Sequence, residues 1–249
     1  MAVHLYGVVR ADATLPAGLQ GRQDAPIRLV RDDSLAVLAS DVDPGHPAGR
    51  KDLLLHAHVL EACAEELTVV PMQFGMALED DEAVREQVLV RQRERLEYLL
   101  ASLDGLVQVT VQASHEEEPA LREMLRRSPD LLAARERLRH SPGGGSAAAK
   151  MELGEAVAAA LQQLGAEDGG HILEELAPLA RAVSESEAKG THGILHAALL
   201  VDRSQRPALD AMVARLREDL ADRVRIRYVG PQPAYSFLEP LETGELAWA

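Results

Sequence analysis

The stretch VHLYGVVR at residues 3–10 indicates that the chain begins with a strand. The run is short, apolar and rich in β-branched residues, which predicts a buried strand rather than a helix. Residues 27–30 and 34–42 predict two more strands, and Asp32 and Asp33 between them predict the turn of a hairpin. The N-terminal part is therefore expected to be built around a sheet.

Helices and strands alternate in the pattern that follows. The predicted elements are a helix over residues 52–66, a very short strand over 68–70, a long helix from a cap at Asp80 or Asp81 to about Leu103, and a strand over 106–113. We therefore expect an α+β domain over residues 1–113. Its helices would pack on one face of a mainly antiparallel sheet, in a ferredoxin-like arrangement.

Residues 114–240 predict a second α+β domain that contains a helical hairpin. The hairpin covers about residues 120–164, with a break near Ser128 and Pro129 and the loop SPGGGS at 141–146. The other predicted elements are one or two helical turns at 171–176, strands at 179–187 and 194–201, a helix over 205–221 and a strand over 223–228. We expect residues 241–249 to form a tail.

The last of these strands, RVRIRY, alternates strictly between basic and apolar side chains. Such alternation is typical of a half-buried strand with one solvated face. The basic face would carry Arg223, Arg225 and Arg227, which we consider as a protein-interaction surface. The simpler interpretation is that this face is only exposed to solvent and binds no partner.

Composition excludes several classes of function. The 249 residues carry a net charge of −14 and only 3% aromatic residues, which disfavours nucleic acid as a partner. The single cysteine excludes an internal disulfide and a thiolate zinc site, and fits a cytoplasmic protein. The sequence has no apolar stretch long enough to span a membrane and no signal peptide at its start.

No group of residues indicates catalysis, a cofactor or a metal. His56 and His58 are expected on opposite sides of a helix, and His192 and His196 are expected in or beside a strand. The segment GGGSAAAK at residues 143–150 lacks the ending of a phosphate-binding loop, so it is interpreted as a connector between helices. Cys63 is expected to be a small core residue.

Two segments rich in turn-forming residues are more informative. VVPMQFG at residues 69–75 and GPQPAYSF at residues 230–237 each follow a strand and combine proline and glycine with large apolar side chains. Both predict rigid turns, which can serve domain packing or form a recognition surface. The large side chains that would anchor them are Met72, Phe74, Tyr235 and Phe237.

These two segments and the start of the chain resemble the gas vesicle F/L protein family. Members carry a V-x-P-[ML]-R-F-G-like turn, a G-P-W-P-P-Y-S-F segment near the C-terminus and a Y-x-Y-G-[IV]-[IV] start, which HLYGVV at residues 4–9 resembles. The resemblance covers about residues 1–240. Gln73 stands where arginine is usual, and Gln232 and Ala234 replace the tryptophan and the last proline of the C-terminal segment. The lost tryptophan removes a residue type that often dominates interfaces.

The resemblance implies a non-enzymatic accessory protein of gas vesicle assembly, without a cofactor. It would bind the small hydrophobic shell protein, other accessory proteins, or both, and could stay in the vesicle as a minor component. A different class remains open: a ferredoxin-like enzyme or small-ligand sensor with a pocket on the sheet face. That alternative requires a polar pocket holding a histidine or carboxylate with a shifted pKa.

Overall fold

The computed structural model describes residues 1–45, 47–142 and 145–238. The chain forms two compact units. The first unit contains Met1–Val109, Leu200–Arg203 and the described residues from Val229 to Leu238, and the second contains Thr110–Leu199 and Ser204–Tyr228. The sequence analysis placed a single boundary between residues 113 and 114. It did not predict that later segments of the chain return to the first unit. The predicted tail at residues 241–249 lies outside the described residues.

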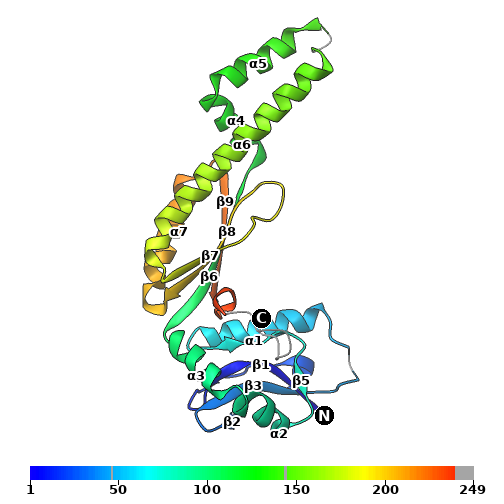
Figure 1. Cartoon of the computed structure of the whole chain (residues 1–249), viewed down its shortest axis with the longest axis vertical. Coiled ribbons are helices and arrows are strands. Elements are labelled where there is room, and N and C mark those ends of the chain that lie inside the picture. Colours follow the sequence, from blue (N-terminus) through cyan, green and yellow to red (C-terminus); the bar gives the residue numbers. More distant parts are fainter. Residues whose placement is uncertain (46, 143–144, 239–249) are drawn as a thin grey trace. The chain divides into compact units, whose positions relative to one another are not determined.

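An antiparallel sheet forms the middle of the first unit (Figure 1). Its strands are β1 (Ala2–Arg10), β2 (Arg28–Asp32), β3 (Leu35–Val42), β4 (Val70–Pro71) and β5 (Ala77–Leu78). Their order is β2-β3-β1-β4, and β5 also pairs with β1. The predicted hairpin is confirmed, with Asp32 opposite Leu35 and a positive φ of 50° at Asp33 in its turn. The sequence analysis missed β5.

Helices cover both faces of this sheet, so the expectation that they share one face is wrong. Helix α1 (Arg50–Ala64) packs on one face, where Tyr6, Ala36 and Leu38 belong to its core. The opposite face carries a second core, in which Val30 and Val37 meet Leu96, Leu99 and Leu100. The physical reason is visible in β1, which is buried at seven consecutive positions and so needs apolar cover on both sides.

The long helix predicted from Asp80 or Asp81 to Leu103 is interrupted. Asp80 is its N-cap, because its side chain accepts a hydrogen bond from the Ala83 N–H at 2.9 Å. Three consecutive segments follow: α2 (Asp81–Val84), the π-helical η2 (Arg85–Val90) and α3 (Arg93–Ser102). Two short 3-10 helices, η1 (Arg22–Asp24) and η6 (Tyr235–Phe237), complete the unit.

A second sheet has the order β7-β8-β6-β9. Its strands are β6 (Leu106–His115), β7 (Ala182–Glu185), β8 (Gly193–Asp202) and β9 (Val224–Gln232). Strand β6, which we expected to close the N-terminal sheet, pairs here with β8 and β9 instead. β6, β8 and β9 each have residues in both units.

The described residues of the second unit form four α-helices, and the 3-10 helices η4 (Ala177–Leu179) and η5 (Arg203–Gln205) follow the third and precede the fourth of these, respectively. They are α4 (Glu117–Arg127), α5 (Pro129–His140), α6 (Ala147–Leu176) and α7 (Arg206–Asp219). The predicted break at Ser128 and Pro129 separates α4 from α5. The helix predicted to end at residue 164 continues for 30 residues in all, through the turns expected at 171–176.

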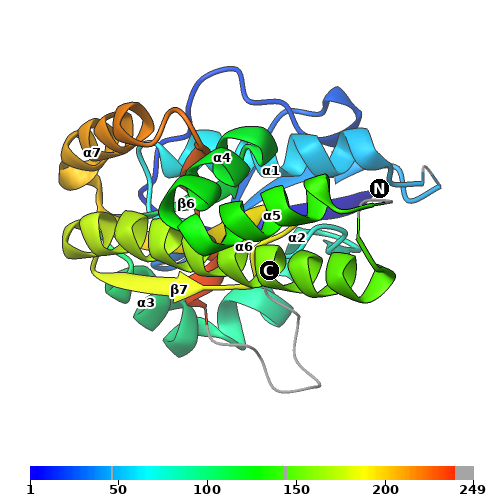
Figure 2. The same ribbon diagram turned by 90° about the horizontal axis from the view of Figure 1, so that it is seen from above.

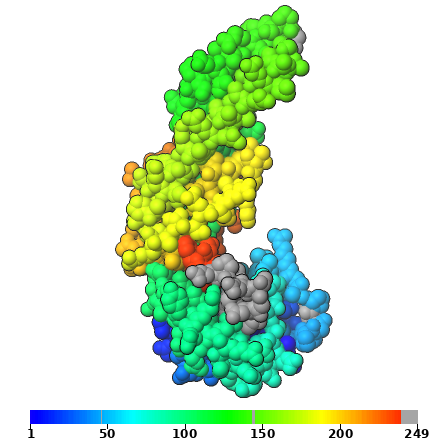
Figure 3. Space-filling view, viewed as in Figure 1, coloured from blue at the N-terminus to red at the C-terminus, as the bar shows by residue number. Residues whose placement is uncertain are grey.

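The predicted helical hairpin consists of α5 and the first part of α6, which contact one another (Figure 2). α5 has no buried residue, and the buried residues of α6 begin at Leu164. In the space-filling view the hairpin is exposed along its length (Figure 3). A groove of about 480 Å³ lies along it, lined by residues of both helices that include Leu131, Leu138 and Leu153.

Candidate functional site

The turn at residues 69–75 follows β4 in the first unit. β4 pairs with β1, with Val70 opposite Val8 and Pro71 opposite Gly7. The Met72 N–H then donates to the Tyr6 carbonyl at 2.8 Å, and the Met72 side chain is fully buried in the core. Gly75 has a φ of +98°, a conformation that a residue with a side chain adopts only with strain. The backbone on both sides of Phe74 is therefore fixed.

Two buried histidines support this turn on its interior side. His56 on α1 contacts the Met72 carbonyl through Nε2 at 3.1 Å, and its Nδ1 lies 3.2 Å from Nε2 of His4 on β1. Because a carbonyl only accepts, His56 Nε2 carries the proton and donates it. In a neutral ring Nδ1 then accepts, so His4 donates from Nε2. The hydrogen bonds fix the tautomers of both rings.

Burial keeps both histidines neutral. It lowers the pKa of His4 to about 3, helped by the nearby His56 and Arg22, while Asp52 acts in the opposite direction. Burial also lowers the pKa of His56, against the bond to the Met72 carbonyl, which raises it. An uncharged pair needs no counter-ion, so it can sit inside the first unit beside aromatic rings.

Phe74 lies on this pair. Its ring centroid is 5.8 Å from that of His4 and 5.6 Å from that of His56, both in edge-to-face geometry. The side chain is half-buried, and the neighbouring Gln73 is exposed. Phe74 is therefore a large apolar side chain with one side seated on a rigid base and the other open to contact.

The C-terminal segment at residues 230–237 is anchored in the first unit. The Ser236 N–H donates to Oε1 of the buried Gln108 at 2.9 Å, and the Gly230–Pro231 peptide bond is cis. Tyr235 packs against the core under α1 and Phe237 packs against the opposite core. Burial raises the pKa of Tyr235. Both side chains are half-buried, so this segment closes the two cores more than it presents a surface.

The three arginines of the predicted basic face lie in the second unit and do not act alike. Arg225 and Arg227 on β9 are exposed, and Val224 and Ile226 are buried, as the alternation predicts. Arg223 departs from the prediction. It precedes the strand, and its guanidinium makes two bonds of 2.9 and 2.7 Å to the carboxylate of Asp168 on α6. A buried carboxylate draws it away from the solvated face.

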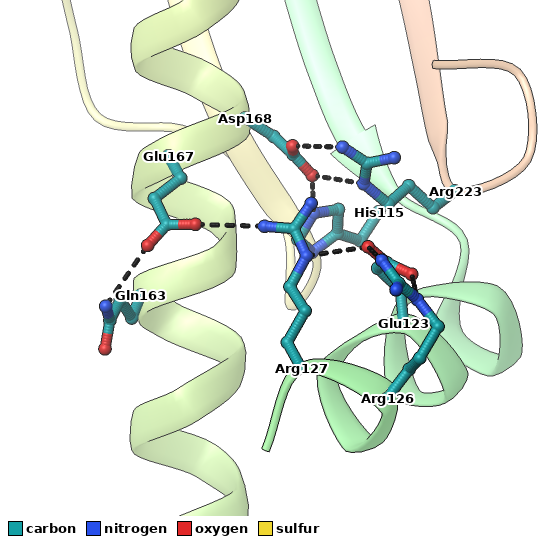
Figure 4. A network of polar contacts seen from close by, with 8 residues as sticks. All are labelled: His115, Glu123, Arg126, Arg127, Gln163, Glu167, Asp168 and Arg223. Carbon is teal, nitrogen blue, oxygen red and sulfur yellow. Dashed lines mark hydrogen bonds and ion pairs between the residues drawn. The ribbon is translucent and has the colours of Figure 1, made fainter. Parts of the chain in front are cut away.

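Asp168 is the centre of a polar network (Figure 4). Its carboxylate also contacts Nε2 of His115 at 3.0 Å, and only 4% of the residue is exposed. Burial alone would raise the pKa of Asp168, but the bonds from His115 and Arg223 outweigh it and hold the pKa at about 2. Nearby, Arg127 joins Glu123 on α4 at 2.6 Å to Glu167 on α6 at 3.1 Å. The network ties α6 to α4 and to the strands.

Two glycines let α6 approach the sheet closely enough for these bonds. A Cβ on Gly165 would lie 2.9 Å from the Ile194 side chain, and one on Gly169 would lie 2.5 Å from the Ile194 carbonyl oxygen. Real Cβ atoms do not come that close to a backbone oxygen. The spacing Gly-x-x-x-Gly thus puts one bare face of the helix against β8, with Asp168 beside it.

The sequence analysis singled out His56 but not His4, which His56 contacts in the structure. His58 is exposed while His56 is buried, which confirms that they point to opposite sides, and Cys63 is a core residue as expected. His196 lies in β8 and His192 precedes it. The sequence analysis missed His4 and His115. The feature of the sequence that could have identified them is a histidine in a mostly apolar strand. In the described part of the chain no group of three or more His, Cys, Asp or Glu side chains could hold a metal ion.

Comparison with known proteins assigns the family. The model of the family described as gas vesicle synthesis protein GvpL/GvpF matches residues 2–239. The chain belongs to this family. Gas vesicle protein F of a Streptomyces species is 35% identical over 242 residues, which cover 96% of this chain and all of that one. Gas vesicle protein F of Microcystis aeruginosa is 25% identical over 244 residues, covering 96% of this chain and 98% of that one.

Solved structures of GvpF have the same fold. The crystal structure of GvpF from Anabaena superposes with a TM-score of 0.82 at 24% identity, covering 97% of this chain and 99% of that one. That of GvpF from Microcystis aeruginosa gives 0.73 at 25% identity, covering 95% and 98%. The predicted family and the predicted two-domain α+β class are confirmed. These relatives are named as gas vesicle proteins.

Membrane insertion by a helix finds no support in the described residues: none of their helices is both long and apolar enough to cross a bilayer.

Proposed function

We propose that this GvpL/GvpF member acts in gas vesicle assembly by binding the small hydrophobic shell protein through the turn that carries Phe74. Membership of the family places the chain among gas vesicle proteins. The contact itself is our inference. An apolar shell subunit must be kept from aggregating before it polymerises, and a fixed apolar side chain on a well-folded acidic protein suits that task.

The observation that carries the proposal is the support beneath Phe74. Large apolar side chains that are only half-buried contribute strongly to interfaces when they are held rigidly, because little conformational entropy is lost on binding. Here the backbone is fixed by the bond from Met72 to Tyr6, and the ring rests on His4 and His56. This support of Phe74 is more extensive than a surface turn needs for domain packing alone.

Met72, Tyr235 and Phe237 have a different role in the proposal. Met72 is fully buried, and the other two close the cores on either side of the first sheet. They position the two turns, and Phe74 makes the contact. Other accessory proteins remain possible partners through the second unit, and a bound chain that persists in the finished vesicle would make this protein a minor component of it.

The alternative of an enzyme or ligand sensor is less well supported. His4, His56 and Asp168 have lowered pKa values, but each is packed in the interior of its unit, with at most 4% of the residue exposed. A substrate could not reach them without local unfolding. Their bonds are satisfied mainly by neighbouring elements, which is typical of structural clusters.

Co-expression with the shell protein and size-exclusion chromatography would test the proposal. The intact chain should co-elute with the shell protein. Phe74→Ala should weaken that association by tenfold or more, since loss of an interface aromatic typically costs about 2 kcal/mol or more. Tyr98→Ala is the matched control, because Tyr98 on α3 is an exposed aromatic of the same unit, 71% accessible.

The remaining outcomes are decisive as well. Circular dichroism must show that the Phe74 variant is folded. Equal co-elution of a folded Phe74→Ala chain would move the contact away from the turn. Absence of co-elution with the intact chain would contradict binding of the shell protein and point to an accessory protein as the partner.

A further inference from the structure

The second sheet has a hollow of about 190 Å³ whose ionisable lining residues are basic. Its lining comes from strands β6, β8 and β9 and from the loop between β7 and β8, and includes no residue of a helix. The lining residues that carry the argument are Gln112, Lys189, His196, Arg225 and Arg227. The same alternation that buries Val224 and Ile226 turns Arg225 and Arg227 toward this hollow.

The charges of the hollow contrast with the rest of the chain. The net charge is −14, yet the ionisable side chains that line this hollow are basic. Arg225 is paired with Glu116 at 2.6 Å. Arg227 and Lys189 have no ion-pair partner among the residues that the structure describes. Two exposed cations of an acidic protein thus line the same hollow.

His196 is already engaged and does not add a third free cation. The Gln112 amide lies 3.3 Å from its Nε2, and Ser186 Oγ lies 2.9 Å from its Nδ1. An amide N–H donates, so Nε2 accepts and Nδ1 donates to the Ser186 hydroxyl in the neutral ring. These bonds fix the ring of His196 within the hollow, and they leave the binding of an anion to Arg227 and Lys189.

The edges of this sheet are less suited to a partner than its face. The carbonyl of Ile226, on edge strand β9, accepts a bond from Nε of Arg217 at 3.2 Å. A side chain thus occupies a hydrogen-bonding position that an added strand would need. The other edge strand, β7, has only four residues. A partner segment would therefore lie across the face, where its side chains can reach the cations.

We propose that this hollow binds an extended acidic segment of a partner protein, with carboxylates meeting Arg227 and Lys189. The inference rests on the proposed assembly function, to which it adds a second contact for an accessory protein. Arginine pairs well with carboxylates because its planar guanidinium can donate two parallel bonds. Nucleic acid fits less well, since the lining has no Phe, Tyr or Trp ring for stacking and the acidic chain repels a polyanion.

A fluorescence-anisotropy titration tests the surface directly. The probe is a labelled peptide of alternating glutamate and serine, and the control peptide has glutamine in place of glutamate. The intact chain should bind only the acidic peptide, more weakly as salt rises. Arg227→Glu should reduce its affinity at least about tenfold and Lys189→Glu several-fold, because each puts a like charge in the hollow.

Arg215→Glu is the matched control variant. Arg215 lies on α7, its side chain is 70% exposed, and its reversal changes the net charge as much as Arg227→Glu does. It should change the affinity for the acidic peptide less than about twofold, because it alters the net charge equally but at a position outside the hollow. Equal losses in both variants would show that only net charge matters and would overturn the proposal.

The remaining outcomes separate this inference from the proposed function. No binding of the acidic peptide by an intact chain that still co-elutes with the shell protein would overturn the acidic-segment site alone. Peptide binding that depends on Arg227 without co-elution would keep this site and remove the shell contact. Equal or tighter binding of a single-stranded oligonucleotide, or a dimer of the chain that Arg227→Glu dissociates, would each replace the acidic partner with another occupant.

Discussion

Each unit buries a polar cluster that ties a helix to a sheet. One of these clusters is neutral, and the other is charged. In the first unit His56 on α1 meets His4 on β1. In the second, Asp168 on α6 meets His115 on β6 and Arg223. The histidine pair is neutral, whereas Asp168 is ionised with a pKa of about 2.

The difference lies in the partner rather than in the depth of burial. His4 and Asp168 are both nearly inaccessible, with exposures of 0% and 4%. Burial disfavours the charged form of each group. Asp168 accepts bonds from His115 and, through both carboxylate oxygens, from the guanidinium of Arg223, and together these bonds outweigh the cost of burial. We therefore expect the second cluster to fail when its charge is removed and the first to fail when charge is added.

The largest effect is expected from Asp168→Ala. The substitution leaves Arg223 and His115 without their shared carboxylate, and breaking a buried ion pair typically costs about 3 kcal/mol or more. Urea unfolding should show this loss, and hydrogen exchange should place it in the second unit. Asp168→Asn keeps the shape and part of the hydrogen bonding, and should cost less. Equal losses for the two variants would mean that packing, and not charge, holds the cluster.

A smaller loss is expected where α6 touches β8. Gly169→Ala would put a Cβ 2.5 Å from the Ile194 carbonyl oxygen, so the helix must shift, at a cost of about 2 kcal/mol. Gly170→Ala is the control, because its Cβ would meet nothing within 4 Å, and it should stabilise the helix by up to about 1 kcal/mol. Urea unfolding of both variants decides. Similar changes in both would show that close approach of α6 is not needed.

The smallest effect is a difference in pH dependence. The pKa of His4 is lowered in the folded chain to about 3, so the unfolded chain binds more protons below about 6.5. The stability that the neutral ring contributes is present above that pH and is lost as pH falls. Asp168, with a folded pKa of about 2, loses its contribution only below about 4. The first unit should therefore weaken at a higher pH than the second.

His4→Gln measures this contribution. Between pH 7 and pH 5 the intact chain should lose about 1 to 2 kcal/mol in the first unit, and the variant should lose about 1 kcal/mol less. Urea unfolding at the two pH values, with hydrogen exchange to separate the units, gives the comparison. His58→Gln, at an exposed position of α1, should leave the pH dependence unchanged. An unchanged slope in His4→Gln would contradict a buried neutral ring.

Local features of the fold were predictable, and contacts between distant segments were not. The hairpin at Asp32 and Asp33, the cap at Asp80 and the break before Pro129 depend on residues that are close in sequence. The destination of β6 depends on β8 and β9, far along the chain. The interruption of the helix after Val84 has no sequence signal that we recognised.

The candidate sites divide in the same way. The turn around Met72 and Phe74 could be predicted because proline, glycine and large apolar side chains occur together in one short segment. Its histidine base could not, since His4 and His56 are 52 positions apart. Asp168 is one of 40 acidic residues, and only the close packing of α6 distinguishes it.

By itself the sequence determined the two-domain α+β class, the helical hairpin, the rigid turns and, through their motifs, the resemblance to the family. Only the tertiary structure decided that helices cover both faces of the first sheet, that β6 joins the second sheet, and that Arg223 leaves the basic face for Asp168. The physical reason is that periodicity, capping and turn chemistry depend on residues that are close together in the sequence. Burial and ionisation of a side chain depend instead on groups that only the folded chain brings within a few ångströms.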